Sequence, residues 1–446
     1  MRHLSPDTAD KVLALNLPGV NSQREYRPYY PAGEVTGHLV GFTDIDEVGL
    51  EGIELAYNHW LAGVAGSKRV LKDRLGRAVE NVASIKPPQH GKDLRTSIDL
   101  RLQYLAYRTL KGAVRKHKAE SGSIVILDVT TGEVLAMVNQ PSYNPNDRSQ
   151  LVPDRYRNRA IADIFEPGSS IKPMIVAAAL ESGRYRASSM VDTAPGFVVV
   201  GPKKIEDSKN LGRISLTTVL SRSSNVGITK IAMSLEPDQL WQSMTRFGFG
   251  SVTSSGFPGE SAGLLTHYSD WRQINQATIG YGYNVSVTPL QLAQAYAAIG
   301  NDGQIRPISL LALDEPNENK RIMDSDTASA VRLMMEEVVG PDGTGQEAGV
   351  DGYRVAGKTG TSWKFAPGGY SEDKYFSIFA GLAPASEPRL AAVVIIDEPT
   401  GALYYGGDVA APVFSDVMAE SLRMLAVAPD ALPGEASAGV VQAMSQ

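Results

Sequence analysis

The chain has 446 residues, of which 43% are hydrophobic and 21% are charged, fractions that exclude a wholly disordered, collagen-like or coiled-coil protein. The formal net charge is -6 with no long block of like charges, which argues against a nucleic-acid partner held through its phosphates. Cysteine is absent, so disulfides, thiolate metal sites and a cysteine nucleophile are excluded.

The first ninety or so residues are rich in Pro, Gly and Tyr and predict a small, irregular β-rich module. Short extended pieces are expected at 26–33 and 37–42. The segment 86–92, with two adjacent prolines and no apolar periodicity, predicts a linker. We therefore expect a non-catalytic module at 1–92, a second domain at 93–428 and a disordered tail at 429–446.

The second domain alternates helical and strand patterns. A helix is expected to begin after Asp99, because apolar residues then recur at three- and four-residue intervals. Thr288 followed by Pro289 predicts the start of another helix. Strands are expected at 123–129, 133–138, 374–382 and 390–396, and a last helix at 411–425. The predicted fold class is α+β, with one sheet assembled from both ends of the domain around a helical insert.

A first candidate for chemistry is the pattern S-x-x-K formed by Ser169 and Lys172. On a helix, positions i and i+3 share a face, so the Lys172 amine would lie beside the Ser169 hydroxyl. Pro167 and Gly168 place Ser169 at a helix start, where N–H groups favour a developing oxyanion. Ser371 and Lys374 match the same pattern, so alone it is weak evidence.

A second candidate is the Ser223-Ser-Asn225 sequence, which follows a short predicted helix. Its hydroxyl and amide groups can relay a proton and hold a substrate amide. The same S-x-N spacing also occurs at 142–144 and 208–210. Taken by itself, each occurrence is typical of a polar loop.

The third candidate is the extended segment 355–361. Glycines on both sides of Lys358 allow a ligand to approach closely, and the ammonium attracts a carboxylate. The hydroxyls of Thr359 and Thr361 can hydrogen-bond the same ligand.

Two competing motifs have the wrong context. Residues 352–359 also satisfy the P-loop pattern, but a P-loop must follow a strand and open a helix, and neither is predicted around this segment. The sequence G-E-S-A-G at 259–263 matches a nucleophile elbow but lies in a predicted loop. The six histidines have no metal-ligand spacing, so we expect neither a metal nor a cofactor.

The order S-x-x-K, S-x-N, K-T-G along one chain is the pattern of penicillin-binding proteins and serine β-lactamases. Over nearly its whole length the sequence resembles the class B penicillin-binding proteins, which are monofunctional D,D-transpeptidases of the cell wall, and particularly the division-specific (septal) group. Further matches lie at 49–54, 96–103, 256–260, 281–292 and 404–407.

The resemblance implies an antiparallel sheet flanked by helices, a helical subdomain and an N-terminal pedestal. It also implies that Ser169 attacks the penultimate D-Ala carbonyl of a stem peptide and that an amine of a second peptide then takes the acyl group. β-Lactams would inhibit the enzyme by acylating the same serine. Other implied partners are a membrane glycosyltransferase and further cell-division proteins.

The resemblance also assigns roles to single residues. Lys172 would be the general base, with its pKa lowered by burial and by Lys358. Ser223 would pass a proton to the leaving group, and Asn225 would orient Lys172 and the substrate. Backbone N–H groups of Ser169 and Thr361 would form the oxyanion hole. The K-T-G segment would hold the terminal carboxylate and two tyrosines would wall the cleft: Lys358, Thr359, Gly360, Thr361, Tyr283 and Tyr404.

The expected location is the periplasmic face of the inner membrane. Members of the family carry an N-terminal membrane anchor, and we expect that helix to be absent from this chain, which as given is expected to be soluble. The longest uncharged apolar run, 390–396, is far shorter than the roughly 20 residues that a spanning helix needs.

Three alternatives remain. A serine β-lactamase or D,D-carboxypeptidase of the same fold would hydrolyse the acyl-enzyme, but no E-x-x-L-N loop with a deacylating Glu occurs between 226 and 357. A non-catalytic binding protein would not need all three motifs. A P-loop nucleotide hydrolase would be recognised by nucleotide binding.

Overall fold

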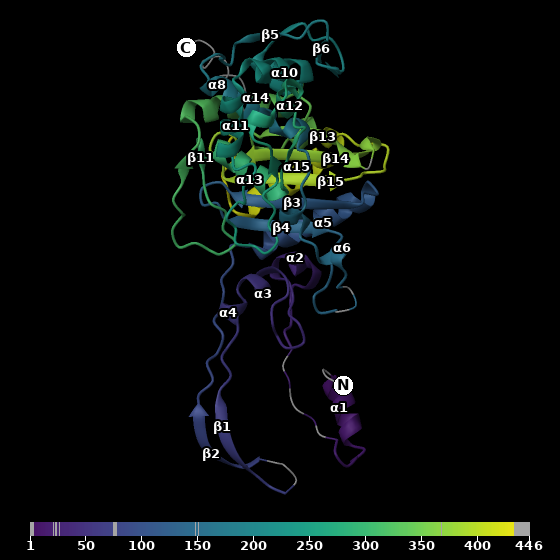
Figure 1. Ribbon diagram of the computed structural model, residues 1–446, viewed down its shortest axis with the longest axis vertical. Helices are drawn as coiled ribbons and strands as arrows, with labels where there is room; N and C mark the ends of the chain where they lie inside the picture. Colours follow the sequence, from purple (N-terminus) through teal and green to yellow (C-terminus); the bar gives the residue numbers. More distant parts are fainter. Residues whose placement is uncertain are drawn as a thin grey trace.

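In the computed structural model, the chain forms an elongated N-terminal module and then a broad domain (Figure 1). The structure describes residues 4–20, 22, 25, 27–74, 78–147, 149, 151–366 and 368–431. The tail expected at 429–446 lies outside the described residues from position 432 onward. Its first part is anchored, because Asp430 accepts hydrogen bonds from the backbone of Arg354 and from Ser386.

Five antiparallel strands form the central sheet in the order β13-β14-β15-β3-β4. They are β13 (Ala356–Ala366), β14 (Gly369–Ala383), β15 (Leu390–Asp397), β3 (Ser121–Asp128) and β4 (Val134–Gln140). In the middle of the sheet, Leu390 of β15 pairs with Asp128 of β3. The prediction of one sheet built from both ends of the domain is confirmed.

One face of the sheet is covered by the first and last helices of the domain, α5 (Leu100–Lys116) and α15 (Gly406–Met424). Asp99 caps α5 as predicted, accepting a 2.9 Å hydrogen bond from the Arg101 backbone. Helix α15 begins five residues before the predicted start. Gly406 and Gly407 are poor helix formers, but here tertiary packing overrides their propensity.

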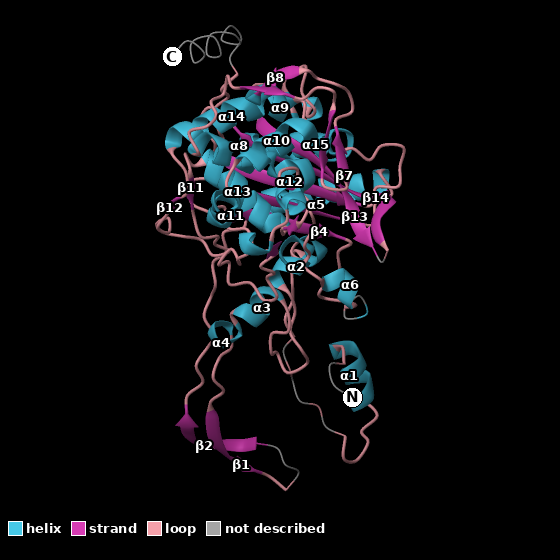
Figure 2. Cartoon of the chain, turned by 45° about the horizontal axis from the view of Figure 1, so that its top comes forward, coloured by secondary structure: helices cyan, strands magenta, loops and turns pink. Residues whose placement is uncertain are grey.

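The other face carries the helical insert (Figure 2). Its longer helices are α8 (Lys172–Glu181), α10 (Asn225–Ser234), α11 (Pro237–Arg246), α13 (Pro289–Gly300) and α14 (Ser325–Val339). Helix α13 starts with the predicted cap, since Thr288 and Gln291 exchange hydrogen bonds of 2.8 and 3.1 Å. Within the described ranges, no helix has the length and apolar character needed to cross a bilayer.

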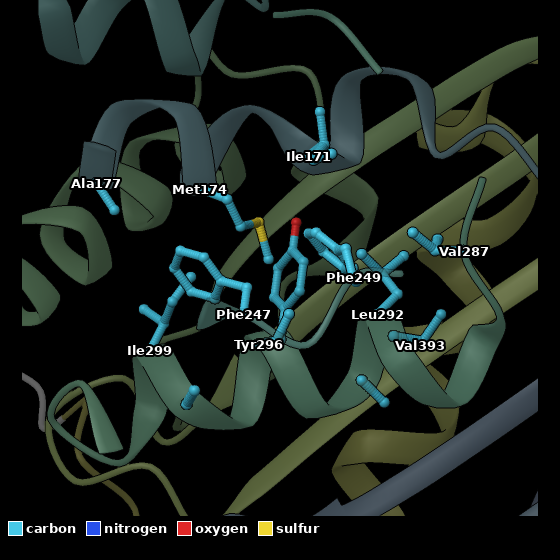
Figure 3. Packing of buried hydrophobic residues seen from close by; sticks show 14 of the residues in the cluster. Ile171, Met174, Ala177, Phe247, Phe249, Val287, Leu292, Tyr296, Ile299 and Val393 are labelled. Atoms are coloured by element: carbon cyan, nitrogen blue, oxygen red, sulfur yellow. The ribbon is translucent and has the colours of Figure 1, made fainter. Parts of the chain in front are cut away.

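A buried aromatic core lies directly below the start of α8 (Figure 3). Met174 packs with Phe247 and Phe249, and the Tyr296 hydroxyl points up from α13. That hydroxyl donates a 2.7 Å hydrogen bond to the Ser170 carbonyl. The backbone next to Ser169 is therefore held by a fully buried side chain of another helix.

The N-terminal module contains one strand pair, β1 (Ser67–Lys72) with β2 (Ala78–Lys86). Its other regular elements are short helices: α1 (Pro6–Leu13), η1 (Gly33–Val35), α2 (Gly37–Val40), α3 (Gly52–Ala56) and α4 (Asn58–Leu61). The extended piece expected at 37–42 was wrong, because α2 lies there. A Cβ on Gly41, whose φ is +79°, would lie 1.9 Å from the Glu51 carbonyl oxygen, so this glycine serves close packing of α2 against α3.

The predicted linker 86–92 runs back along the segment that precedes β1. Val64 and Gln89 exchange backbone hydrogen bonds of 2.8 and 2.9 Å, and the Lys92 ammonium lies 4.2 Å from the Trp60 ring centroid. The module joins the large domain at α2, where His38 contacts the Arg155 carbonyl at 2.7 Å. Burial lowers the pKa of His38 to about 4, so this imidazole is neutral at pH 7.

Candidate active site

Ser169 lies in the 3-10 turn η3 (Gly168–Ile171) immediately before α8. Gly168 has φ +53°, and a Cβ there would lie 3.2 Å from the Thr361 carbonyl oxygen. The glycine therefore lets the turn lie against β13, the edge strand of the sheet. Ser362 of β13 fixes this contact by donating a 2.7 Å hydrogen bond to the Glu166 carbonyl.

Lys172 is fully buried at the start of α8. Its Nζ donates hydrogen bonds to the Ser223 carbonyl at 2.6 Å, to Asn225 Oδ1 at 2.8 Å and to Ser223 Oγ at 3.2 Å. Burial lowers its pKa from 10.5 to about 7, and the negative charge of Asp207 opposes this shift. A large share of Lys172 is therefore uncharged at neutral pH and can accept a proton.

The S-x-N residues form the turn between α9 (Leu216–Ser221) and α10. Ser223 has φ +57°, a left-handed conformation that costs a non-glycine residue about 1 kcal/mol or more. Backbone hydrogen bonds to Leu220 and Val219, of 3.1 and 2.9 Å, stabilise this turn. Because of it, three acceptor atoms from two residues converge on Lys172.

Lys358 is also fully buried, and its Nζ donates to the carbonyl and the hydroxyl of Thr359 at 3.1 and 3.2 Å. Burial, and then the charge of Lys172, hold its pKa well below 10.5. Thr344 approaches from outside the motif, with its hydroxyl 2.7 Å from the Thr359 hydroxyl. Gly360 is needed for space, since a Cβ there would lie 2.9 Å from the Pro167 carbonyl oxygen.

The start of α15 completes the site. The Gly406 N–H donates a 3.0 Å hydrogen bond to Thr361 Oγ1, which leaves the Thr361 hydroxyl proton available for a ligand. The N-terminus of a helix carries a partial positive charge. Together with Lys358, it makes this end of the site suited to a carboxylate.

All three motifs border one cavity of about 550 Å³. The residues that line it are Ser169, Asp207, Ser208, Lys209, Leu211, Arg222, Ser223, Asn225, Thr344, Thr359, Thr361, Tyr405, Gly407 and Asp408. The cavity therefore brings together a nucleophile, a buried base with its hydrogen-bond acceptors, and an anion-binding site. These are the groups that acyl transfer needs.

The two tyrosines named from the resemblance lie at different places. The Tyr283 hydroxyl accepts a 3.2 Å hydrogen bond from the Trp363 backbone N–H, and so touches β13 two residues beyond Thr361. Tyr404 stacks on Tyr375 with ring centroids 4.4 Å apart. Its neighbour Tyr405 lines the cavity.

The competing motifs lie elsewhere or in the wrong structure. Ser371 donates to Asp373 and Lys374 pairs with Glu398 on the exposed part of β14, so this second S-x-x-K forms no site. The P-loop match runs into strand β13 instead of opening a helix. Ser261 of the elbow match lies in an irregular loop.

Sequence reasoning missed Asp207, Thr344 and the Gly406 N–H. Asp207 accepts hydrogen bonds from Ser224 Oγ and from the Asn225 and Val226 backbone. No pattern marks an acid 17 residues before a turn as its partner. The only available signal was that Asp207 directly precedes one of the rejected S-x-N matches, Ser208 to Asn210.

Comparisons with known proteins agree with this geometry. Residues 122–419 match the family described as penicillin binding protein transpeptidase domain, and residues 1–96 match the penicillin-binding protein dimerisation domain. The chain is 46% identical over 431 residues to the peptidoglycan D,D-transpeptidase FtsI of Escherichia coli, covering 97% of this chain and 73% of that protein. It is 43% identical to the probable peptidoglycan D,D-transpeptidase PbpC of Pseudomonas aeruginosa, covering 97% and 76%.

A solved structure is similar as well. The apo transpeptidase domain of penicillin-binding protein 3 from Burkholderia pseudomallei is 41% identical, with a TM-score of 0.70. The match covers 76% of this chain and 98% of that one.

Proposed function

The chain belongs to the penicillin-binding protein transpeptidases, and from that membership we propose that Ser169 carries the acyl group when the protein cross-links peptidoglycan stem peptides. The enzyme is a serine-type peptidoglycan D,D-transpeptidase of class B. The observation that supports Ser169 as nucleophile is the shared cavity, in which it meets the Ser223–Asn225 turn and the K-T-G strand.

In the acylation step, Lys172 takes the Ser169 hydroxyl proton while Oγ attacks the penultimate D-Ala carbonyl. In the free enzyme Nζ contacts Ser223 and Asn225, so the Ser169 hydroxyl must turn toward it when substrate binds. The proton then passes through Ser223 to the leaving amine of the terminal D-Ala. Asn225 holds Lys172 in place throughout.

The K-T-G strand binds the terminal carboxylate in this proposal. Lys358 supplies the charge, and Thr359 and Thr361 supply hydroxyl donors, with Gly360 allowing the strand to lie against the nucleophile turn. The N–H groups of Ser169 and Thr361 bind the oxyanion, where one donor contributes roughly 3 kcal/mol in comparable enzymes. Neither Tyr283 nor Tyr404 is among the residues that line the cavity; Tyr283 contacts β13 just beyond Thr361, and Tyr405, the neighbour of Tyr404, forms part of the wall.

The second half-reaction separates a transferase from a hydrolase. An amine of a second stem peptide attacks the Ser169 ester, and the peptide bond forms as the serine regains its proton. A β-lactam carries a strained amide and a carboxylate, so it acylates Ser169 in place of the D-Ala-D-Ala end. Because residues 226–357 contain no E-x-x-L-N loop with a deacylating Glu, we expect the penicilloyl enzyme to persist for hours.

We further propose a role in septal wall synthesis during cell division, at the periplasmic face of the inner membrane. There the protein would work with a membrane glycosyltransferase and other division proteins. Residues 1–92 would be the non-catalytic module and 93–428 the transpeptidase domain.

Incubation with a fluorescent penicillin, followed by mass spectrometry of the labelled peptide, tests this proposal. We expect one adduct on Ser169, no adduct in Ser169→Ala and normal labelling in the matched control Ser371→Ala. An adduct elsewhere contradicts the assignment. Return of free enzyme within seconds after a chase, with excess hydrolysed drug, would identify a β-lactamase.

A further inference from the structure

Asp207 follows the hairpin of β6 (Phe197–Val200) and β7 (Lys203–Glu206) and lines the active-site cavity. Its carboxylate accepts hydrogen bonds from Ser224 Oγ at 2.6 Å, from Asn225 N at 2.5 Å and from Val226 N at 3.1 Å. We propose that Asp207 is a positioning residue for acylation, which fixes the Ser223–Asn225 turn and with it the acceptors around Lys172.

The first evidence is the way in which α10 begins. The first N–H groups of a helix have no partner inside the helix and need an acceptor. Ser224, the N-cap, accepts from the Gly227 N–H at 2.8 Å, and Asp207 accepts from the two N–H groups before it. One carboxylate from another segment thus shares the capping of this helix and is stabilised by the helix dipole.

The second evidence is the direct connection to Lys172. Asn225 donates its backbone N–H to Asp207 and accepts from Lys172 Nζ through Oδ1, so a single residue links the carboxylate to the base. Ser223, which provides the other two acceptors, has a strained φ of +57°. A turn of this kind persists only where its surroundings hold it, and Asp207 supplies contacts to two of its residues, Ser224 and Asn225, and to the next residue, Val226.

The charge of Asp207 adds a second, separable effect. It favours the ammonium form of Lys172 and so opposes the lowering of the pKa by burial. The other charged groups near the base are Lys358 on β13 and, around the cavity, Lys209, Asp408 and Arg222, which pairs with Asp342. Of these, Asp207 is the one whose charge acts on the pKa of Lys172 most directly.

The test uses the acylation rate constant with a fluorescent penicillin, measured as a function of pH. Acylation needs uncharged Lys172, so its rate rises with pH through the pKa of that lysine. Asp207→Asn keeps the shape and one oxygen acceptor but removes the charge, so the midpoint of this rise must move to lower pH. Asp207→Ala removes both the hydrogen-bond acceptors and the charge. Its maximal rate should fall about 10- to 100-fold, a loss typical of a displaced catalytic group.

Two further variants separate the effects. Ser224→Ala removes the contact with Asp207 and the N-cap bond from Gly227 but keeps the charge of Asp207, so we expect a lower maximal rate at an unchanged midpoint. The control Asp99→Asn changes another aspartate that accepts a backbone N–H at a helix start, here at α5 and outside the residues that line the cavity. It should alter neither the maximal rate nor the midpoint. Unaltered maximal rates in Ser224→Ala and in folded Asp207→Ala overturn the positioning role, and Ser224→Ala keeps the test decisive even if Asp207→Ala fails to fold. An unchanged midpoint in folded Asp207→Asn overturns the effect of the charge only.

This inference rests on the proposed role of Lys172 as base, and the two can fail separately. If Ser169→Ala were still acylated, the proposed function would be wrong. If Ser169→Ala is inert but Ser224→Ala and folded Asp207→Ala keep the maximal rate of the unaltered protein, the function stands and the inference about Asp207 is wrong.

Discussion

Replacing Lys358 with methionine separates the charge of this residue from its size. Methionine fills a similar volume, so the change mainly removes the ammonium that faces the proposed carboxylate site. A hydrogen bond to a charged group contributes about 1.5–3 kcal/mol, and each 1.4 kcal/mol is a factor of ten. We therefore expect acylation by a penicillin to slow by roughly 10- to 100-fold. Thr361 and the N-terminus of α15 remain and preserve the residual rate.

The assay compares a penicillin with its methyl ester, which lacks the carboxylate charge. In the unaltered protein the acid should react faster than the ester, and Lys358→Met should remove most of that difference while leaving the ester rate nearly constant. Equal losses for acid and ester would mean that Lys358 acts by shape. No loss for either would refute the carboxylate assignment.

The same substitution has an expected effect on stability. Burial holds the pKa of Lys358 well below that of the unfolded chain, so the unfolded state binds more protons. Stability therefore rises with pH between the folded and unfolded pKa values, and at neutral pH the buried lysine is destabilising. Lys358→Met should have a higher melting temperature than the unaltered protein, and the gain should be larger at lower pH. Loss of stability at every pH would contradict this reasoning.

Three more predictions follow from the site and its supports. The acylation rate should rise with pH through about 7, where Lys172 loses its proton, and level off above; a profile without this rise would exclude Lys172 as the base. Ser362→Ala should lower the free energy of unfolding by about 1–3 kcal/mol and slow acylation, because the Glu166 carbonyl loses its donor. Ser97→Ala removes a similar 2.7 Å bond to the Val134 carbonyl at β4, the sheet edge opposite β13, and should affect stability alone. An equal rate loss in both variants would contradict a role of Ser362 in holding the nucleophile turn. Gly406→Ala would place a Cβ 2.2 Å from the Gly360 carbonyl oxygen, so we expect the free energy of unfolding to fall by at least about 1–3 kcal/mol and penicillin labelling to slow. The control Gly112→Ala adds a Cβ in open space on α5 and should raise the free energy of unfolding. Normal stability and labelling in Gly406→Ala would refute the close contact.

Local signals predicted the sheet and the main helices well. The caps at Asp99 and Thr288 are side-chain bonds to nearby backbone, so a few adjacent residues carry the information. The strand at 390–396 is buried along its length and was visible as an unbroken apolar run. In contrast, Gly41 was expected within an extended piece at 37–42, although its positive φ serves a close approach to the distant Glu51 backbone.

The three motifs of the site could be found because each is short and their order is informative. Their supports could not be found in that way. Thr344 meets Thr359, and Gly406 meets Thr361, only after β13, α14 and α15 have packed together. Asp207 serves the turn at Ser224 through a hairpin that has no sequence signature of its own. Such contacts depend on the folded chain path, which local patterns do not encode.

The pairing of β3 with β15 also sets an order for the biosynthesis of the domain. The ribosome produces β3 and β4 early, but their partner in the sheet is made only near the end of the chain, and long-range pairing of this kind is slow to form. Until then, the apolar edge of β3 has no partner from β15, and an unpaired strand edge of this kind is prone to pair with other chains. Because α15 follows the strands of the sheet in the chain and donates the Gly406 N–H to Thr361, we expect the penicillin site to form only after α15 has been made and packed. Penicillin labelling should therefore report chains whose last helix has packed on the sheet, and not unfinished ones.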